Sequence, residues 1–425
     1  MATGARDGER PRVANVVLGV SGGIAAYKAA ELLRLFTESG HDVRVVPTRA
    51  ALSFVGAPTW AALSGHPVTT EVWDDVHEVP HVRLGQQADL VVVAPATADL
   101  MAKAAHGLAD DLLTSTLLTA RCPVVLAPAM HTEMWLHPAT QDNVSTLRRR
   151  GTVVLEPATG RLTGTDTGPG RLPDPEQIFQ ACRRVLARGV DARADLTGRH
   201  VVVSAGGTRE HLDPVRFLGN RSSGRQGYAL GATAAARGAE VTLVSANVAL
   251  PDPAGAKVVR VVSADQLRTA VLEAAATADA VVMAAAVADF RPVAQQDTKI
   301  KKAAGEPEPV ALARTSDVLA ELAHHRRRDG QVVVGFAAET GDHTGSVLEH
   351  GRAKLAAKGC DLLVVNEVGN DRGFELADNA AVVLGADGTE TDVPLGPKEA
   401  VADAVWDLVA DRLPVGRPDL PAPGA

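Results

Sequence analysis

The sequence predicts an α/β protein built from two Rossmann-like domains, each with a mostly parallel sheet. Short apolar runs rich in valine and alanine alternate with runs of helical period, a pattern typical of strand–helix–strand units. The pattern begins at residue 13 and begins again at residue 201. We therefore expect a first domain at 13–188 and a second at 198–412, joined by a polar linker at 189–197.

Composition and charge narrow the class of protein. The chain has 425 residues, of which 46% are hydrophobic and 22% charged, as in soluble globular proteins. A net charge of -8 argues against a general nucleic-acid binder. We see no apolar run of signal-peptide or membrane-spanning length, and the three cysteines lack disulfide or zinc spacing, so we expect a cytoplasmic protein without membrane contact. The polar ends at 1–12 and 413–425 are expected to be disordered.

The first domain opens with a strand at 13–20 that ends in Ser21-Gly22-Gly23 and leads into a helix at 24–39. A glycine turn before a helix can hold a phosphate, although this turn alone is weak evidence. Further elements are expected to follow: strands at 43–46, 89–97 and 122–129, helices at 98–105 and 175–187, and a lid-like surface loop at 160–171. Two of these strands end in Ala-Pro-Ala turns, which leave a slot for a flat ligand.

The second domain opens with a strand at 201–204 and a polar loop at 208–225 before the helix at 227–237. This loop should overhang the carboxyl end of the first strand, where ligands bind in open α/β sheets. Its arginines, serines and Asn220 suit a ligand that carries phosphate, but they are equally consistent with an exposed, solvated turn. Later elements are expected as strands at 240–245, 279–287, 332–340 and 361–366, and a helix at 352–359.

The motifs, taken in order, resemble those of the bifunctional flavoprotein family of coenzyme A biosynthesis, in which a phosphopantothenoylcysteine decarboxylase is fused to a phosphopantothenate–cysteine ligase. The first half carries SGGIAAYK (21–28), APATAD (94–99), APAM (127–130) and GPGR (168–171). The second carries SAGGTRE (204–210), LGNRSSG, AAAVADF (284–290), KIKK (299–302) and GFAAET (335–340). The resemblance implies a flavodoxin-like first domain and a ligase-type second domain.

For the first domain the resemblance implies FMN-dependent oxidation of a cysteinyl thiol, loss of CO2 and reduction of the resulting enethiol. His81 matches the family's catalytic histidine; without the family match it would be a half-buried histidine at the edge of a strand. The candidate FMN contacts are Ser21, Gly22, Gly23, Thr48, Ser53, Ala96, Thr97, Asp99, Ala129 and Met134.

Two positions depart from the family pattern. His131 stands where the family usually has Asn, and Thr163-Gly164-Thr165 aligns with an Ala-Cys-Gly whose cysteine delivers a proton. Cys122 and Cys182 are expected to be structural. Our hypothesis is that another group, such as His131, Thr165, Asp166 or a water molecule, supplies this proton.

For the second domain the resemblance implies ligation of 4′-phosphopantothenate to L-cysteine through an acyl-cytidylate made from CTP. Asn220 matches the residue that contacts the activated acyl group, and we expect it to share one cavity with Lys299. Mg²⁺ is expected with the triphosphate, but the sequence does not identify its ligands. The candidate substrate and nucleotide contacts are Arg216, Ala284, Ala285, Asp289, Lys299, Ser316, Asp317, Phe336, Lys354 and Lys358.

Two other functions remain open from the sequence alone. The first domain could be a non-catalytic, regulatory FMN-binding domain attached to an active ligase, because the lid cysteine is missing. Alternatively, two Rossmann-like domains would serve a nucleotide-sugar transferase, although that class leaves KIKK and LGNRSSG unexplained. The family resemblance also implies a homo-oligomer, with trimers of decarboxylase halves, pairs of ligase halves, and active sites completed across subunits.

Overall fold

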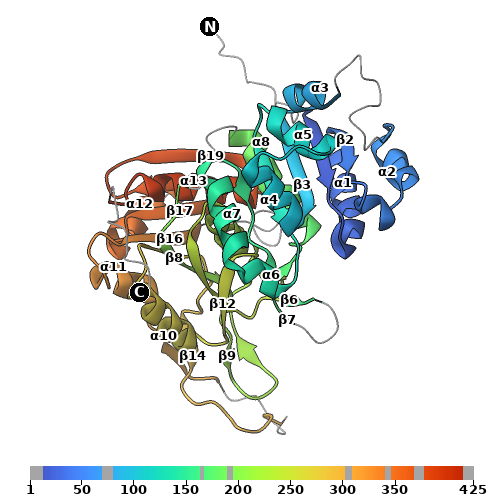
Figure 1. The fold of residues 1–425 in the computed structure, drawn as a ribbon. Helices are drawn as coiled ribbons and strands as arrows, with labels where there is room; N and C mark the ends of the chain where they lie inside the picture. Colours follow the sequence, from blue (N-terminus) through green and yellow to red (C-terminus); the bar gives the residue numbers. More distant parts are fainter. Residues whose placement is uncertain are drawn as a thin grey trace. The chain divides into compact units, whose positions relative to one another are not determined.

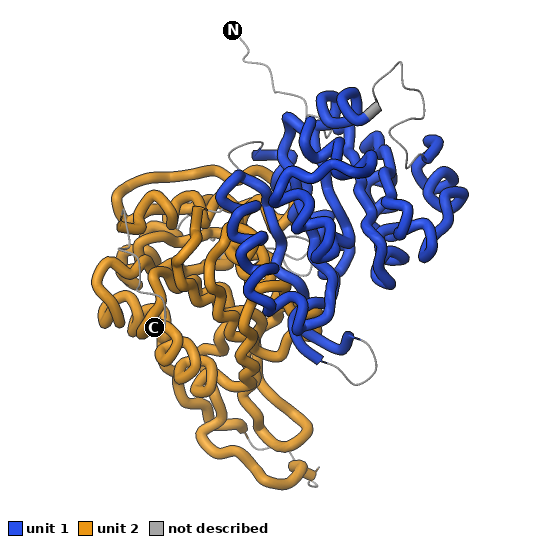
Figure 2. Tube along the Cα trace, viewed as in Figure 1, with its two compact units in different colours: residues 1–194 blue, residues 195–425 orange. Residues whose placement is uncertain are grey.

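The computed structural model describes residues 13–68, 80–162, 167–188, 195–301, 309–339, 346–367 and 378–414. The chain divides into two compact units, residues 1–194 and 195–425 (Figure 2). The division falls inside the segment predicted as a linker, but Asp195 and Leu196 belong to the second unit. Leu196 is fully buried there, and Asp195 pairs with Arg237. Both predicted tails lie outside the described residues, apart from Leu413 and Pro414.

The first unit contains a parallel five-stranded sheet in the order β2-β1-β3-β4-β5, the flavodoxin-type order. Valines fill the central strands because both faces of the sheet are covered by helices. The strands are β1 (Asn15–Val20), β2 (Asp42–Pro47), β3 (Leu90–Ala96), β4 (Val124–Pro128) and β5 (Val153–Val154). The order changes direction between β1 and β3, so the carboxyl ends of these strands form the expected binding edge.

The helices of the first unit cover the sheet from both faces. One core cluster joins the sheet to α1 (Ala29–Glu38) and α8 (Pro175–Arg188), and another joins it to α4 (Ala98–His106), α5 (Leu112–Thr119) and α7 (Pro138–Arg149). The remaining helical segments are η1 (Ile24–Lys28), η2 (Ala51–Ser53), α2 (Ala57–Ser64), α3 (Pro80–Gln87) and α6 (Thr132–Leu136).

Two predictions for the first unit need correction. The predicted helix at 24–39 begins as a 3-10 turn, η1, before it becomes α-helical at Ala29. The predicted lid loop is in part an antiparallel hairpin of β6 (Ala158–Arg161) and β7 (Thr167–Arg171). Its glycines hid the strand pattern, because residues such as Gly168 and Gly170 contribute no side chain to a strand period.

The second unit has an eight-stranded sheet in the order β12-β11-β8-β13-β16-β17-β18-β19. Its first six strands are parallel and reproduce the 3-2-1-4-5-6 order of the Rossmann fold; β18 and β19 add an antiparallel edge. The strands are β8 (His200–Gly206), β11 (Glu240–Ala246), β12 (Ala256–Val261), β13 (Ala280–Met283), β16 (Val332–Glu339), β17 (Leu362–Glu367), β18 (Asp378–Gly385) and β19 (Glu390–Pro397).

Helices cover both faces of this second sheet. One core cluster contains α9 (Arg225–Ala236) and α13 (Lys398–Ala410), and another contains α10 (Ala264–Ala275), α11 (Val318–His324) and α12 (Val347–Lys358). Figure 1 also shows an extension that projects from the sheet. The short strands of the extension are β9 (Glu210–His211), β10 (Phe217–Leu218), β14 (Phe290–Pro292) and β15 (Leu312–Arg314).

Three features of the second unit differ from prediction. The strand expected at 279–287 ends at Met283, because Ala285 N–H turns to the hydroxyl of Ser204 at 3.1 Å. The polar loop at 208–225 contains the β9–β10 hairpin. The β18–β19 hairpin and α13 were not predicted. None of the helices in the described parts of the chain has the length and apolar character needed to span a bilayer.

Candidate functional sites

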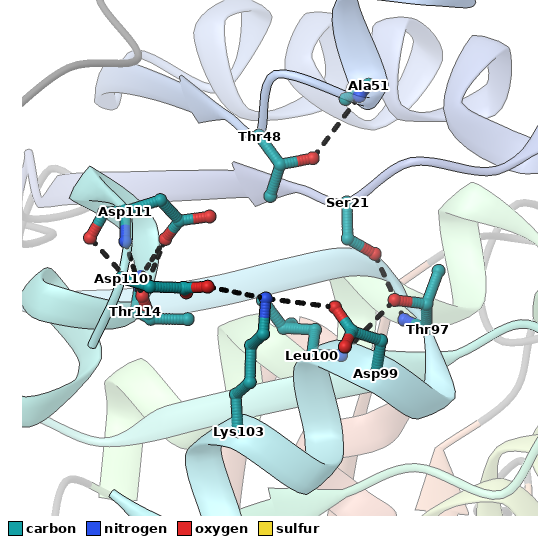
Figure 3. A network of polar contacts seen from close by, with 10 residues as sticks. All are labelled: Ser21, Thr48, Ala51, Thr97, Asp99, Leu100, Lys103, Asp110, Asp111 and Thr114. Carbon is teal, nitrogen blue, oxygen red and sulfur yellow. Dashed lines mark hydrogen bonds and ion pairs between the residues drawn. The ribbon is translucent and has the colours of Figure 1, made fainter. Parts of the chain in front are cut away.

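A hydrogen-bonded turn joins the carboxyl ends of β1 and β3 in the first unit. The hydroxyl of Ser21 donates to the carbonyl oxygen of Pro95 at 2.7 Å and accepts from the N–H of Thr97 at 3.0 Å. Figure 3 shows the contact between Ser21 and Thr97. Thr97 in turn caps α4 by accepting from the N–H of Leu100. Ser21 therefore holds the binding edge together, and its hydroxyl is already used within the protein.

The turn after Ser21 can receive a phosphate through its backbone. Among the described residues, no backbone acceptor or side chain pairs with the N–H groups of Gly22, Gly23 or Ile24. A Cβ atom on Gly22 would lie 2.4 Å from the Cβ of Ala50, so glycine lets the turn approach the loop after β2. In that loop the hydroxyl of Thr48 accepts from the N–H of Ala51 at 3.2 Å, while Ser53 is exposed.

The carboxyl end of β4 completes this edge. The N–H of Ala129 donates to the carbonyl oxygen of Ala96 at 3.1 Å, which places these two small residues side by side. His131 and Met134 follow at and within α6, both exposed, and His131 makes no side-chain capping bond. The β6–β7 hairpin touches the same turn, because Met130 N–H donates to Gly170. Thr163, Gly164, Thr165 and Asp166 lie outside the described residues.

Asp99 belongs to an ionic chain beside this edge. Its carboxylate lies 3.2 Å from the ammonium of Lys103, which also contacts Asp110 at 3.0 Å (Figure 3). The hydrogen bond with Asp110 raises the pKa of Lys103 and lowers the pKa of Asp110. Because Asp99 is 76% exposed, the pair orients its carboxylate without removing it from solvent.

His81 lies away from the predicted flavin residues within one chain. It is near the start of α3, where its carbonyl oxygen accepts from the hydroxyl of Thr119 at 2.7 Å. Thr119 is the last residue of α5, just before the amino end of β4, whereas the flavin residues follow the carboxyl ends of the strands. The Nδ1 atom of His81 is buried and has no hydrogen-bond partner among the described residues. His81 is therefore helical rather than at the edge of a strand.

The cysteine environments agree with a structural role. Burial raises the pKa of the Cys122 and Cys360 thiols to about 11, and it raises the pKa of Cys182 as well. A thiol with a raised pKa is a poor source of thiolate near neutral pH. Cys182 and Cys360 are also buried in core clusters.

The second unit contains a cavity of about 980 Å³ at the carboxyl ends of β13, β16 and β17. It lies at the point where the strand order reverses between β8 and β13, the usual ligand position in this fold. The predicted contacts that line it are Asn220, Ala284, Ala285, Asp289, Ser316, Asp317, Phe336, Lys354 and Lys358. Ser222 and Ser223, just before α9, and Arg225, its first residue, also line this cavity.

Glycines after β8 allow the loop to fold over the cavity. Gly206 has a φ of 86°, and a Cβ atom there would lie 2.0 Å from the carbonyl oxygen of Ala246. The loop then brings Asn220 against the segment after β13, where its amide donates to the carbonyl oxygen of Val287 at 3.0 Å. The side chain of Asn220 is thus oriented, with a second amide hydrogen available to a ligand.

Lys358 and Asp317 face each other on another wall of this cavity. Asp317 caps α11 by accepting from the N–H of Ala320 at 3.1 Å, and it forms an ion pair with Lys358. Burial alone would raise the pKa of Asp317, but the hydrogen bonds from Lys358 and Ala320 and the charge of Lys354 lower it overall. Lys354 and Lys358 share one face of α12, as their spacing predicts.

Arg216 and Lys299 do not line this cavity. Arg216 pairs with Asp213 and donates to the carbonyl oxygen of Ile300, while Asp213 accepts from the N–H of Ile300. These bonds hold the exposed Lys299 on the extension. Burial alone would raise the pKa of Asp213. The backbone N–H groups of Val215, Arg216 and Ile300 and the side chain of Arg216 lower that pKa well below its usual range. The prediction that Lys299 shares a cavity with Asn220 is therefore not met within one chain.

Six polar residues that line the cavity were missed by sequence reasoning: Gln226, Arg314, Thr315, Asn366, Asn379 and Lys398. Asn366 lies near the end of β17, a predicted strand whose end could have suggested it, but Asn379 and Lys398 come from the unpredicted hairpin and helix. Among the described residues, no group of three or more His, Cys, Asp or Glu side chains could hold a metal ion.

The two sites define the class of protein. The first unit joins a flavodoxin-type strand order to a glycine turn whose backbone N–H groups have no acceptor among the described residues, and the second joins a Rossmann order to a cavity of about 980 Å³ lined by lysines and arginines. This combination describes an enzyme with one flavin-type unit and one nucleotide-dependent unit.

Comparisons with known proteins agree with this class. A family model described as "Flavoprotein" matches residues 5–187, and one described as "DNA/pantothenate metabolism flavoprotein C-terminal domain" matches residues 196–413. The coenzyme A biosynthesis bifunctional protein CoaBC of Mycolicibacterium smegmatis is 61% identical, over 93% of this chain and 97% of that protein. The protein of the same name from Bacillus subtilis is 42% identical, over 93% and 96%. A crystal structure of a CoaBC C-terminal domain is 34% identical, covers 51% of this chain and 97% of that chain, and has a TM-score of 0.43.

The chain belongs to the family of coenzyme A biosynthesis bifunctional proteins. It is a flavoprotein with two enzymatic activities, a phosphopantothenoylcysteine decarboxylase in the first unit and a phosphopantothenate–cysteine ligase in the second. The findings support this bifunctional assignment rather than a ligase with a non-catalytic first domain or a nucleotide-sugar transferase.

Proposed function

We propose that the second unit activates 4′-phosphopantothenate with CTP and that the first unit decarboxylates the ligated product with FMN. The observation that carries the ligase half is the single cavity that collects Asn220, Asp289, Phe336, Lys354 and Lys358. A carboxylate needs a leaving group before an amine can displace it, and a cationic cavity at a strand-order reversal suits a nucleoside triphosphate.

In the ligase step, a substrate carboxylate oxygen attacks the α-phosphorus of CTP, and pyrophosphate leaves. Lys354 and Lys358 offset the triphosphate charge, and the first turn of α9 offers backbone N–H groups. Asn220 donates to the acyl oxygen of the cytidylate while the cysteine amine displaces CMP. We place Asp289 and Phe336 at the cytidine and expect Ala284, Ala285, Ser316 and Asp317 to complete this contact surface.

We also propose that Mg²⁺ enters with CTP rather than as a resident ion. Triphosphate transfer requires charge neutralisation, and the described residues contain no cluster of metal-ligating side chains. Asp289 and Asp317 are the carboxylates of the cavity that could contact such an ion or its water molecules.

In the first unit, FMN fits the edge formed after β1, β2, β3 and β4. The N–H groups of Gly22, Gly23 and Ile24 would hold the phosphate, assisted by Thr48 and Ser53, while Ala96, Ala129 and Met134 would lie beside the ring. When bound, FMN supplies the two-electron chemistry that removes and returns electrons at the cysteinyl carbon and sulfur. Ser21 and Thr97 keep the edge rigid, and Asp99 is oriented there by Lys103.

The proton that completes enethiol reduction requires a group other than a lid cysteine. His131 is exposed at the end of β4 beside the hairpin that carries the lid, and we propose it as this donor. The test is His131→Asn, which restores the usual family residue. We expect CO2 release to continue while unreduced enethiol accumulates. Complete reduction by this variant would instead leave Thr165, Asp166 or water as the donor.

We propose that the sites are completed in a homo-oligomer. His81 lies at the opposite end of the sheet from the flavin edge of its own chain, so it would serve a neighbouring decarboxylase unit. The extension of the second unit exposes apolar side chains suited to pairing, and pairing would carry Lys299 and Arg216 to a second cavity. The exposed apolar residues are Val215, Phe217, Phe290, Val293, Ile300 and Leu312.

One experiment tests both halves of the proposed function. Purified protein should show flavin absorbance, and it should release pyrophosphate over many turnovers only when phosphopantothenate, cysteine and CTP are all present. CO2 should follow from the ligated product. Pyrophosphate release without phosphopantothenate, or continuous release without cysteine, would contradict the ligase half, and flavin-free protein that still decarboxylates would contradict the FMN half. A cytoplasmic location is expected for a pathway that uses these metabolites.

A further inference from the structure

The cavity of the second unit contains a polar cluster that the proposed nucleotide contacts do not include. It consists of Gln226 on α9, Asn366 on β17, Asn379 on β18 and Lys398 on α13, and we call it the Lys398 cluster. All four residues line the cavity.

Lys398 is a buried cation held in place by its neighbours. Its side chain is 6% exposed, and its carbonyl oxygen accepts from the amide of Gln226 at 3.0 Å. Asn379 donates to the other end of the Gln226 amide at 3.3 Å. The amides thus position the start of α13. Glu399 and Asp378 act on the Lys398 ammonium through their charge, and no described residue forms an ion pair with it. A largely buried lysine whose ammonium reaches a cavity without a close counter-ion favours a ligand that supplies one.

Asn366 adds an unsatisfied acceptor to the same cavity. Its Oδ1 atom is buried and has no hydrogen-bond partner in the described part of the chain. Buried polar atoms are paired in most proteins, so an unpaired one that lines a cavity points to a bound ligand. A ligand for this cluster should therefore carry an anion for Lys398 and an N–H or O–H donor for Asn366.

The Lys398 cluster is separated from the cations assigned to the nucleotide. Lys398 lies on α13, which packs with α9 in one core cluster, and Trp406 of α13 donates to Leu230 of α9 at 2.9 Å. Lys354 and Lys358 lie on α12, which packs with α11 on the other face of the sheet. The cavity therefore has lysines from both faces of the sheet, and Arg221, Arg225 and Arg314 also line it, so it has enough cations for the anions of two different substrates.

We propose that the Lys398 cluster binds the phosphopantoyl end of the acid substrate: the Lys398 ammonium pairs with its phosphomonoester, and Asn366 accepts from its hydroxyl or amide N–H. This inference rests on the proposed ligase function. The substrate carries both required groups, and its carboxylate end would then extend toward Asn220, which lines the same cavity. Burial and the charge of Arg225 lower the pKa of Lys398 in spite of Glu399 and Asp378, so the phosphate dianion would compensate a disfavoured cation.

The test is Lys398→Met in the full-length protein, with cysteine-dependent pyrophosphate release as the readout. We expect the KM for phosphopantothenate to rise by at least about tenfold, as for the loss of a charge-assisted contact, while the KM for CTP changes by less than about twofold. Inhibition by pantothenate, which lacks the phosphate, should be unchanged. Lys398→Arg should retain most of the affinity, and Lys257→Met, at an exposed position on β12, is the control.

The possible results separate the inference from the function on which it rests. If the unaltered protein releases no pyrophosphate, the proposed ligase function fails. If it is active but Lys398→Met raises the KM for CTP, or weakens pantothenate as much as phosphopantothenate, the Lys398 cluster is not the phosphate subsite. Should Lys398→Met fail to fold, Lys398→Gln and Asn366→Leu provide the same comparison, and unchanged phosphopantothenate binding in both would overturn the proposal.

Discussion

The hydroxyl of Ser21 joins the two strands that flank the strand-order reversal of the first unit, because it accepts from Thr97 and donates to Pro95. Ser21→Ala would remove the acceptor of the Thr97 N–H at a position that is 2% exposed, while the carbonyl oxygen of Pro95 keeps the bond from the backbone N–H of residue 21 at 3.2 Å. We expect a loss of about 1–3 kcal/mol in the free energy of unfolding and a lower flavin content in the purified protein. Flavin absorbance and thermal melting measure the two effects. Ser39→Ala, at an exposed position after α1, is the control and should change neither.

The position of His81 predicts that decarboxylation requires more than one chain. His81→Asn and Gly22→Val should each be inactive alone, the second because a Cβ at Gly22 meets Ala50 at 2.4 Å. Co-expression of the two variants should restore activity in mixed oligomers, in which one subunit supplies His81 and another the intact flavin turn. Decarboxylation assays of doubly tagged complexes measure this. Mixed complexes as inactive as the parent variants would show that His81 does not act in a neighbouring chain.

The ion pair between Lys358 and Asp317 predicts a pH-dependent contribution to stability. Because the folded-state pKa of Asp317 lies below its ordinary value of 3.8, the contribution is present above that value and is lost as the pH falls through the folded pKa. Lys358→Met should thus be less stable at pH 7, by less than about 1 kcal/mol for a pair this exposed, and the difference should vanish in acid. Denaturant unfolding across pH tests this.

Lys358→Met should also affect the ligase reaction. We expect the KM for CTP to rise by about tenfold in Lys358→Met, because a triphosphate contact is lost. Asp317→Asn is the comparison: it also removes the pH-dependent pair but leaves Lys358 available to CTP, so its KM for CTP should rise by less than that of Lys358→Met, although Asp317 belongs to the proposed contact surface. An unchanged KM for CTP in Lys358→Met would remove this lysine from the nucleotide site.

The buried side chain of Arg237 stabilises the second unit through ion pairs. Its guanidinium is 1% exposed and lies 2.5 Å from Asp195 and 2.9 Å from Asp407. Arg237→Met should destabilise this unit by about 2–4 kcal/mol, because it removes a buried guanidinium from its ion pairs with Asp195 and Asp407. We expect loss of ligase activity at a lower temperature with flavin retained by the first unit. The control is Arg352→Met, whose pair with Glu390 is 56% and 38% exposed and should contribute little.

The elements that the sequence predicted well are those with a strong local signal. Buried valine strands such as β1, β3, β8 and β16 reveal themselves because a parallel sheet covered on both faces needs continuous apolar runs. The β18–β19 hairpin escaped notice because its apolar residues are interrupted: β18 begins with Asp378 and Asn379, and β19 has two prolines and an exposed Leu395. The strand after Asp279 was overextended, because alanines 284–286 are apolar yet turn away toward the cavity.

The amino-acid sequence by itself determined the two-domain α/β class, the glycine turns and most of the cavity lining, because each depends on neighbouring residues or on a motif at a strand end. Only the tertiary structure decided that His81, Arg216 and Lys299 lie outside the sites of their own chain, and that Lys398 lies inside one. The reason is that the order of strands in a sheet and the packing of helices on its faces bring together residues far apart in sequence. Gln226 and Lys398, 172 positions apart, meet only for that reason.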